Sequence, residues 1–280
     1  MAATVSPTFS LLRQLVLRDL RVRYRSTIFG FLWSLVKPAI LIALFFAVFQ
    51  MFPGIRGTLT DFKGSVSFGV FLSIGIITWT FFAGALNEGV NAYLVHHHLI
   101  TKAAFYRPVL PIASAISHFI HYLVAQAALI LFLGFIGYHS WQPQILLLIP
   151  LSLVELIMVS SIVAILAWAQ VLVRDTTQFL ELGLMVWFYG SPIIYPANLP
   201  LGFFDSRILD FIYMANPVAP IVLFRQRILM ANYLRSPEQL DPTMSGLQDY
   251  LLLALLVTAI LTAFAWGMNR RVNHIIADRI

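Results

Sequence analysis

Long apolar runs separated by short polar segments dominate the pattern of this chain. A helix needs roughly 20 apolar residues to cross a bilayer, and six runs come close to or exceed that length. The six runs are Phe31–Phe52, Val66–Leu86, Val109–Tyr138, Ile145–Val173, Thr177–Tyr195 and Tyr250–Met268. The pattern therefore predicts an all-α membrane protein with six transmembrane helices. In the fifth run, the sequence Gly190-Ser191-Pro192 is expected to break the far end of the helix.

The segment that precedes the first run, residues 1–30, is basic and loosely amphipathic. It carries five arginines, Arg13, Arg18, Arg21, Arg23 and Arg25, with only Asp19 of opposite sign among them. If the segment is helical, five aliphatic residues share one broad face: Leu12, Leu15, Val16, Leu20 and Val22. Arg18 and Arg21 lie opposite, whereas Arg23 falls on the apolar side. We expect an amphipathic helix in the cytoplasmic membrane interface, with its cations towards anionic headgroups.

The segment between the fifth and sixth runs, residues 196–249, is too long for a tight turn. It contains Phe211–Phe224, fourteen residues without a charge, interrupted by Pro217 and Pro220. This stretch is too short to span a bilayer, and its length suits a re-entrant helical hairpin on the outer side. An ordinary outer loop with an apolar patch is the alternative. We therefore expect one transmembrane domain with residues 31–195 holding helices 1 to 5, residues 250–268 holding helix 6 and residues 269–280 as a cytoplasmic tail.

Composition and charge support a polytopic membrane protein. Hydrophobic residues make up 60% of the chain, charged residues 11%, and the mean hydropathy is +0.85. A soluble domain is roughly 25% charged. Of the 18 Lys and Arg, twelve fall on the segments that would be cytoplasmic if the N-terminus is inside, and six fall outside. The formal net charge of +6 therefore reflects the basic residues on the cytoplasmic side, and it predicts a topology with both termini in the cytoplasm. We expect no nucleic-acid partner.

The sequence lacks the motifs of several enzyme classes. There is no cysteine, which excludes disulfides, thiolate metal sites and a cysteine nucleophile. Its three lysines, Lys37, Lys63 and Lys102, do not follow a glycine, so the phosphate-binding loop of ATPases is absent. His96, His97 and His98 are consecutive and would point three ways on a helix, which favours a polar interfacial turn over a metal site. We expect no catalytic residue, no metal and no cofactor in this chain.

Polar residues inside the predicted spans are the sharpest local features. Glu155 lies near the middle of the fourth span, where a carboxylate must be protonated, paired or facing water. A functional role and a structural hydrogen bond both remain open for it. Glu181 lies one to two turns into the fifth span and can reach cytoplasmic water. His118 and His121 share a helix face, and either form a proton relay or are satisfied by neighbouring helices.

Aromatic residues concentrate in the first and fifth spans. Interfacial belts account for terminal residues such as Trp33 and Tyr195. They account less well for Trp187 and Tyr189, because a polar N–H or O–H in mid-span needs a partner. Two interpretations remain open at these positions: rings that line a conduit and stack on sugar faces, or plain helix packing.

Four stretches, in order along the chain, resemble a known family. They are RDLRVRYRSTIFGFLWSLVKP at 18–38, FYRPVLPIASAISH at 105–118, SPIIYP at 191–196 and NPVAPIV at 216–222. Together they resemble the permease subunit of ABC transporters that export O-antigen, teichoic acid or capsule, and the O-antigen branch in particular. The resemblance covers nearly the whole chain.

The resemblance implies an inner-membrane exporter subunit for a lipid-linked polysaccharide. It implies a homodimer bound to two copies of a separate ATPase subunit, which would bind ATP and Mg²⁺. The loop from Tyr93 to Arg107 would dock on that ATPase, through His96, His97, His98, Lys102 and Arg107. This loop carries neutral histidines where the family often has lysines. The first and fifth spans would line the path with Trp33, Phe46, Phe49, Trp187, Tyr189 and Tyr195. The outer hairpin would form the gate.

The basic segment admits two roles beside this resemblance. Arg21, Arg23 and Arg25 either recruit an anionic lipid-pyrophosphate carrier from the membrane, or only fix the topology. Other function classes also stay open. These are a permease of the same superfamily for lipids or drugs, and a membrane-embedded glycosyl- or phosphotransferase, although the few acids in the cytoplasmic loops argue against the latter. A secondary transporter would need paired intramembrane ionisable groups and internal repeats, which the sequence does not show.

Overall fold

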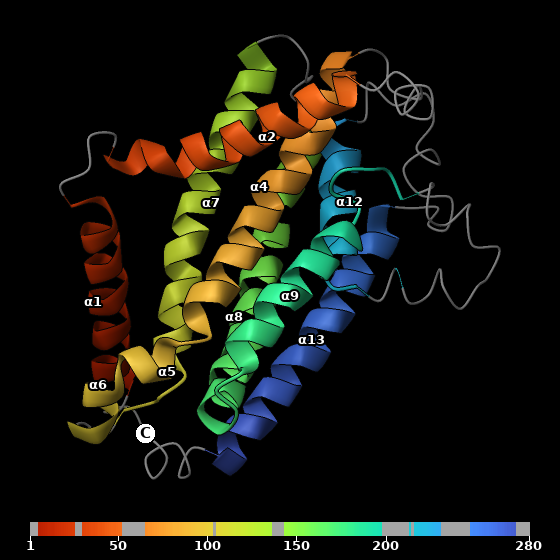
Figure 1. Ribbon diagram of the computed structural model, residues 1–280. Helices are drawn as coiled ribbons and strands as arrows, with labels where there is room; N and C mark the ends of the chain where they lie inside the picture. Colours follow the sequence, from red (N-terminus) through yellow and green to blue (C-terminus); the bar gives the residue numbers. More distant parts are fainter. Residues whose placement is uncertain are drawn as a thin grey trace.

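The computed structural model describes residues 5–25, 30–51, 65–102, 105–135, 143–197, 213, 216–230 and 247–272. Within these ranges the chain is helical and contains no strand. Four helices are long and apolar enough to cross a membrane: α4 (Ser65–Gly89), α7 (Val109–Phe135), α8 (Leu148–Leu172), which follows a 3-10 turn at Pro143–Leu147, and α13 (Leu247–Val272). They run side by side as a bundle (Figure 1). The predicted second, third, fourth and sixth runs are therefore confirmed as long apolar helices.

The first and fifth apolar runs form shorter helices. α2 (Trp33–Met51) follows a 3-10 turn at Gly30–Leu32 and crosses α7 and α4 at a steep angle (Figure 1). α9 (Thr176–Tyr189) has 14 residues and ends at the predicted Gly190-Ser191-Pro192 break. At about 1.5 Å per residue it extends roughly 21 Å, less than the ~30 Å hydrocarbon thickness. The predicted fifth span to Tyr195 is therefore too long for the helix that forms, and neither helix counts among the candidate spans.

The centre of the bundle is built around α4. Its side chains Phe71, Leu72, Ile74 and Ile76 have no solvent-accessible surface. Glycine lets its neighbours approach closely, as small residues do at helix contacts in membranes. A methyl group at Gly75 would lie 2.8 Å from the backbone oxygen of Ile193, which is closer than such atoms pack. The segment that follows α9 is therefore held directly against the backbone of α4.

A short helix, α12 (Ala219–Leu229), lies in the interior between the long helices. All eleven of its residues are buried. With 11 residues it cannot span the bilayer, as predicted for the apolar run that leads into it. Arg225 and Arg227 belong to the six basic residues that the sequence placed in outer loops, and both instead lie in a buried helix. Arg225 is completely buried, and Arg227 lies over the ring of Tyr250 at 5.4 Å. Most of residues 196–215 lies outside the described ranges, so the predicted hairpin is described only in part, at residues 213 and 216–224.

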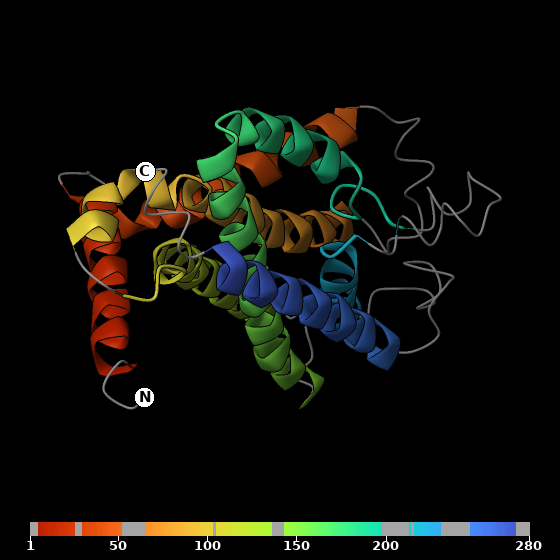
Figure 2. The same ribbon diagram turned by 90° about the horizontal axis from the view of Figure 1, so that it is seen from below.

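The N-terminal helix α1 (Val5–Tyr24) stands beside α7, with the short helices α5 (Ala92–Val95) and α6 (His97–Lys102) at its foot (Figures 1 and 2). Leu15 and Val16 are buried against this neighbourhood, in one cluster with Tyr93. The prediction for Val22 is wrong, because this side chain is 67% exposed. At about 100° per residue, position 22 lies about 120° from Val16 around the helix, whereas position 23 lies only about 20° away. The buried face therefore continues into Arg23.

Candidate functional site

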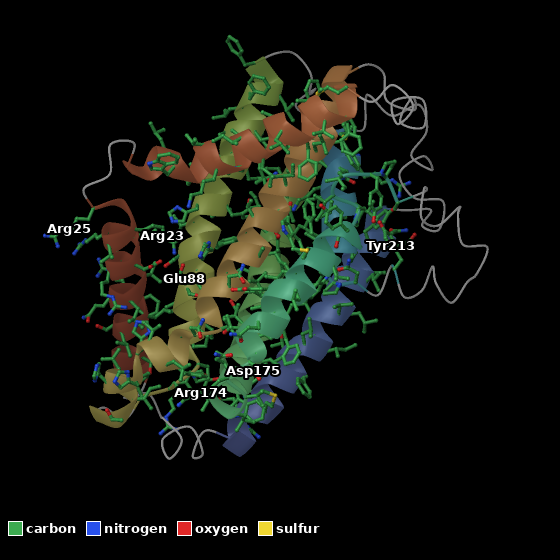
Figure 3. The ribbon with its side chains drawn as sticks, in the orientation of Figure 1. Arg23, Arg25, Glu88, Arg174, Asp175 and Tyr213 are labelled. Carbon is green, nitrogen blue, oxygen red and sulfur yellow. The ribbon has the colours of Figure 1, made fainter. Side chains whose placement is uncertain are left out.

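Four charged or titratable side chains connect α1 to α4 and α7, and Arg23 is at their centre. We call them the Arg23 cluster: Asp19, Arg23, Glu88 and His118. Arg23 Nη2 pairs with Asp19 Oδ2 at 3.2 Å and also with Glu88 Oε2. His118 Nε2 lies 2.9 Å from Glu88 Oε2 and 3.3 Å from Arg23 Nη1. Figure 3 shows Arg23 on the side of α1 that faces Glu88. The cluster therefore explains why a cation stands on the otherwise apolar face of α1.

A glycine on α4 makes room for this cluster. A methyl group at Gly84 would lie 2.7 Å from His118 Nδ1 and 2.8 Å from its Cε1. Any side chain at this position would push the imidazole away from Glu88, one helical turn further along α4. Gly84 and Glu88 are four residues apart and thus lie on the same face of the helix. One face of α4 therefore supplies both the carboxylate and the space that its histidine partner needs.

A cavity of about 540 Å³ opens beside the Arg23 cluster, and we call it the Arg23–Lys37 cavity. Residues of α1, α2, α4 and α7 contribute to its walls. Its polar and aromatic lining consists of Arg23, Trp33, Ser34, Lys37, Thr80, Phe81, His118, His121 and Tyr122. The α7 residues among them recur at the spacing of one helix face. Two obligate cations from different helices thus face one chamber, together with two histidines.

The three arginines predicted to act together do not share one environment. Arg21 and Arg25 are exposed, and Figure 3 shows Arg25 on the opposite side of α1 from Glu88. Arg23 is half-buried in the cluster and lines the cavity. The structure brings Arg23 together with Lys37, His118 and His121 instead. The sequence did not single out Lys37 for a site, because a lysine near the cytoplasmic start of a span is expected only to extend its ammonium group to the membrane surface.

The predicted coupling residues divide between two surroundings. His96 faces α1, where its Nε2 lies 2.5 Å from Arg18 Nη2 and its Nδ1 lies 3.0 Å from the Ala92 carbonyl oxygen. His97 and His98 have neighbouring rings, with centroids 3.6 Å apart. Arg107 is half-buried, and its Nη1 has no hydrogen-bond partner among the described residues. The side chain of Lys102 lies outside the described part of the chain. In that part, no three His, Asp or Glu residues gather closely enough to hold a metal ion.

The Arg18–His96 contact should respond to pH. Nδ1–H of neutral His96 donates to the Ala92 carbonyl, which leaves Nε2 to accept from the Arg18 guanidinium. Burial, together with Arg18, holds the pKa of His96 below its usual range. Because the folded-state pKa lies below the unfolded one, the contact contributes stability above the ordinary histidine pKa and loses it as pH falls.

Replacing His96 by phenylalanine should reveal this dependence, since the ring is kept and the acceptor is removed. We expect His96→Phe to lower the unfolding temperature at about pH 8, and the difference from the parent chain to shrink at about pH 5. His98→Phe is the matched control, because this neighbouring histidine is exposed. An effect of His96→Phe that is the same at both pH values would contradict the assignment.

The predicted path aromatics occupy different environments as well. Trp33 lines the Arg23–Lys37 cavity, and Phe49 packs edge-on against Phe68 with centroids 5.1 Å apart. The indole N–H of Trp187 donates to Asn216 Oδ1 at 2.7 Å, and its ring packs edge-on against Phe82 at 4.9 Å. Phe46 is half-buried and lies against Gly69 of α4, while the Tyr195 hydroxyl donates to the carbonyl of Tyr189, which is exposed. Trp187 thus ties α9 to the segment before α12, and a conduit role for the six residues stays a prediction.

Glu155 forms a buried ion pair that sequence analysis did not find. Arg225 Nη2 of α12 lies 2.6 Å from Glu155 Oε2 of α8, and both side chains are excluded from solvent. The guanidinium also donates to Ser152 Oγ at 3.2 Å and to Gln126 Oε1 at 3.4 Å, and lies 5.0 Å from the ring centroid of Tyr122. The expectation that Glu155 must be protonated, paired or facing water is met by pairing. Glu181, the other acidic residue singled out, is exposed on α9.

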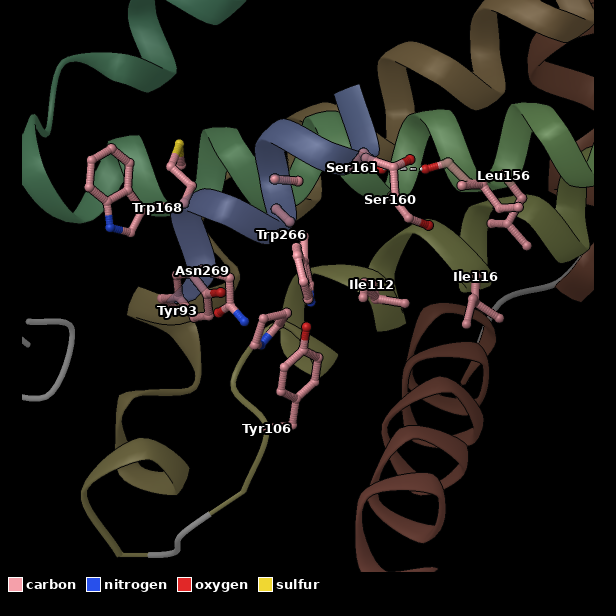
Figure 4. Close-up of a pocket in the computed structure, with 16 residues that line it drawn as sticks. Tyr93, Tyr106, Ile112, Ile116, Leu156, Ser160, Ser161, Trp168, Trp266 and Asn269 are labelled. Carbon is pink, nitrogen blue, oxygen red and sulfur yellow. Dashed lines mark hydrogen bonds between the residues drawn. The ribbon is translucent and has the colours of Figure 1, made fainter. Parts of the chain in front are cut away.

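A second cavity, of about 330 Å³, lies between α7, α8 and α13 (Figure 4). Ser161 and Thr262 bridge α8 and α13 there through their hydroxyls at 3.0 Å. The guanidinium carbon of Arg270 lies 3.5 Å from the ring centroid of Trp266. None of the described residues that line this cavity is Asp, Glu, Lys, Arg or His. Its chemistry is therefore apolar and aromatic, in contrast to the Arg23–Lys37 cavity.

Comparison of the amino-acid sequence with curated proteins finds similar transport proteins. No profile of a known protein family matches the chain. Two proteins of Klebsiella pneumoniae, both called O-antigen export system permease protein RfbA, are 26% and 25% identical over 225 residues, or 79% of this chain and 81% of theirs. The RfbA permease of Myxococcus xanthus is 26% identical over 231 residues, or 82% of this chain and 84% of its own. The resemblance inferred from the ordered motifs is thereby confirmed: over about four-fifths of its length, the chain is similar to O-antigen export permeases.

Proposed function

We propose that this chain is the transmembrane subunit of an ATP-driven exporter that moves a polysaccharide, in particular O-antigen, across the cytoplasmic membrane. The observation that carries the proposal is its similarity, across about four-fifths of both chains, to three proteins named as O-antigen export permeases. Four long apolar helices support the membrane location. In this proposal the chain is a transport component, and a separate subunit hydrolyses ATP.

The proposal includes a homodimer with six spans in each copy and both termini in the cytoplasm. α2 and α9 both present apolar side chains that the single chain leaves exposed. On α2 these are Ile40, Leu44 and Val48, and on α9 they are Phe179, Leu182 and Val186. Such surfaces suit contact with lipid or with a second copy of the chain. The buried helix α12, which reaches the level of Glu155, supports a re-entrant segment before the last span.

The proposal assigns ATPase docking to the loop from Tyr93 to Arg107, with α1 beside it. α5 and α6 lie at the foot of α1, and His96 accepts a hydrogen bond from Arg18. Tyr93 is buried in the same cluster as Leu15 and Val16 of α1. A displacement of this loop would therefore be passed to α1 through packed side chains and to α7 through the chain itself. Val95, which is 66% exposed, lies on the outer surface of the loop and is available to a partner.

Co-expression with a candidate ABC ATPase subunit from the same genome, followed by co-purification, tests the proposal. We expect a stoichiometric complex in mild detergent that hydrolyses ATP. Val95→Asp should reduce both partner recovery and hydrolysis at least about tenfold, because it places an unpaired charge in the proposed interface. Leu146→Asp is the matched control, since Leu146 is an equally exposed aliphatic residue in the 3-10 turn that precedes α8.

The opposite result would change the assignment. A chain that purifies alone, with no ATPase partner in any detergent that keeps it folded, contradicts the exporter proposal and favours a membrane-embedded glycosyl- or phosphotransferase. A complex whose neighbouring genes encode teichoic acid or capsule synthesis, or drug resistance, keeps the exporter mechanism and changes only the cargo.

A further inference from the structure

We propose that the Arg23–Lys37 cavity binds the phosphate group of an anionic membrane lipid. The inference rests on the proposed function in one respect, since the lipid carrier of an exported polysaccharide would be the ligand bound here. The residues that carry it are the cationic side chains of α1 and α2 and the two histidines of α7. For Arg21, Arg23 and Arg25 the sequence left a carrier role and a topology role open, and of the three only Arg23 lines the cavity.

The lining of the cavity has an excess of basic groups. Arg23, Lys37, His118 and His121 line it, and none of the described lining residues is Asp or Glu. Lys37 and Arg23 are obligate cations at neutral pH. They come from α2 and α1, so their charges converge on one chamber from two sides. A phosphate would accept charge-assisted hydrogen bonds from both, and these are among the strongest that proteins make.

Size and wall chemistry indicate an amphipathic ligand and not a bare ion. A volume of about 540 Å³ falls within the range of ~300–1,000 Å³ typical of small-molecule sites. Trp33, Phe81 and Tyr122 supply aromatic walls, and Thr80 supplies a hydroxyl. The adjoining helix α2 leaves Ile40 and Leu44 exposed, at 60% and 54%. A lipid can therefore place its headgroup between Arg23 and Lys37 while its apolar chain lies along α2.

Two carboxylates, Glu88 and Asp19, already pair with Arg23, and Glu88 also contacts a histidine of the cavity wall. The Glu88 carboxylate lies 2.9 Å from His118 Nε2. A phosphate entering the cavity would compete with Glu88 for the Arg23 guanidinium. Removing the charge of Glu88 should therefore strengthen phosphate binding, because the competing anion is gone. Loss of folding cannot imitate such a gain.

Direct binding to the full-length chain in nanodiscs of phosphatidylcholine tests the inference. The probes are farnesyl diphosphate, its alcohol farnesol, and short-chain phosphatidylglycerol, each titrated and followed by native mass spectrometry. We expect farnesyl diphosphate to bind at least about tenfold more tightly than farnesol. Lys37→Gln should remove most of that preference, Lys37→Arg should restore it, and Glu88→Gln should increase affinity for the diphosphate.

Arg13→Gln is the matched control, because Arg13 is an exposed cation of α1 that does not line the cavity. Equal affinity for the diphosphate and the alcohol, or equal losses in Lys37→Gln and Arg13→Gln, would overturn the inference. Preference for farnesyl diphosphate identifies an isoprenoid carrier, and equal binding of phosphatidylglycerol identifies a phosphoglycerolipid. If the chain binds the diphosphate but no ATPase partner, the lipid-phosphate site is supported and the proposed exporter function is contradicted. If it binds an ATPase partner but shows no preference for the diphosphate, the exporter function is supported and the lipid-phosphate site is contradicted.

Discussion

Replacing Arg225 by methionine should lower the free energy of unfolding by about 3–5 kcal/mol, because it leaves the Glu155 carboxylate buried without a counter-charge. The two side chains are joined at 2.6 Å and are shielded from solvent by α7, α8 and α12. Glu155→Gln should have an effect of similar size, since the guanidinium then loses its only acidic partner among the described residues. Unfolding in mixed micelles of increasing SDS content, followed by tryptophan fluorescence, measures both variants.

The double variant separates a missing contact from an uncompensated charge. Arg225→Met with Glu155→Leu should recover most of the loss, because apolar residues of similar volume often replace a buried ion pair at little cost. Glu181→Gln is the control, since this carboxylate is exposed on α9 and its removal should change stability by less than about 0.5 kcal/mol. A double variant that is as unstable as the sum of the single ones would show that the pair is not what couples α12 to α8.

Replacing Gly89 by alanine should destabilise the chain by about 1–3 kcal/mol or more through overpacking. The added methyl would lie 2.2 Å from Val163 Cγ1 of α8 and 2.7 Å from Ser114 Oγ of α7. Gly89 therefore lies where α4 meets α7 and α8, and Val163, whose branched side chain keeps one rotamer in a helix, can make room only if α8 shifts. The same SDS titration gives the free energy of unfolding for comparison with the parent chain.

A second substitution at the junction should relieve the clash. Val163→Ala removes the atom that the new methyl meets, so the pair Gly89→Ala and Val163→Ala should be more stable than Gly89→Ala alone. Gly183→Ala is the matched control, because nothing lies within 4 Å of the position its methyl would take. In a helix this change should be neutral or slightly stabilising. Equal losses at Gly89 and Gly183 would mean that backbone flexibility, and not space, is what the glycine provides.

Hydropathy alone predicted the long helices, because the bilayer requires each crossing segment to satisfy its own backbone in an apolar stretch of known length. The end of α9 was predicted by the residues Gly190-Ser191-Pro192 and not by hydropathy, because the apolar run continues to Tyr195. The partner of Glu155 could not be predicted in this way. Arg225 is 70 residues away, and a cation that follows an uncharged run resembles an ordinary loop residue until the helices are assembled.

The candidate site was predicted in part for the same reason. Arg23 stood out because it broke the apolar face of α1, and the structure explains the exception through Glu88 and His118. Lys37 and the histidines of α7 were considered separately, because nothing in the sequence connects them. Lys37 was explained as a lysine at the membrane surface, and the histidines as residues that bond to neighbouring helices. Only the crossing of α2 over α7 and α4 brings them to one cavity. Sequence patterns report the period of a helix but not the angle at which it meets its neighbours.

The buried position of Arg225 also constrains the order in which this protein can be assembled in the membrane. A lone arginine near the centre of a bilayer costs about 2.5–3.5 kcal/mol on insertion scales, so α12 cannot enter the lipid by itself at low cost. Its acceptors Gln126, Ser152 and Glu155 all lie earlier in the chain, on α7 and α8. During synthesis α7 and α8 therefore leave the ribosome before α12 does. When α12 packs against these two helices, the Arg225 guanidinium gains its hydrogen-bond acceptors. The Glu155 carboxylate, which would be costly to bury in α8 alone, gains its counter-charge in the same step.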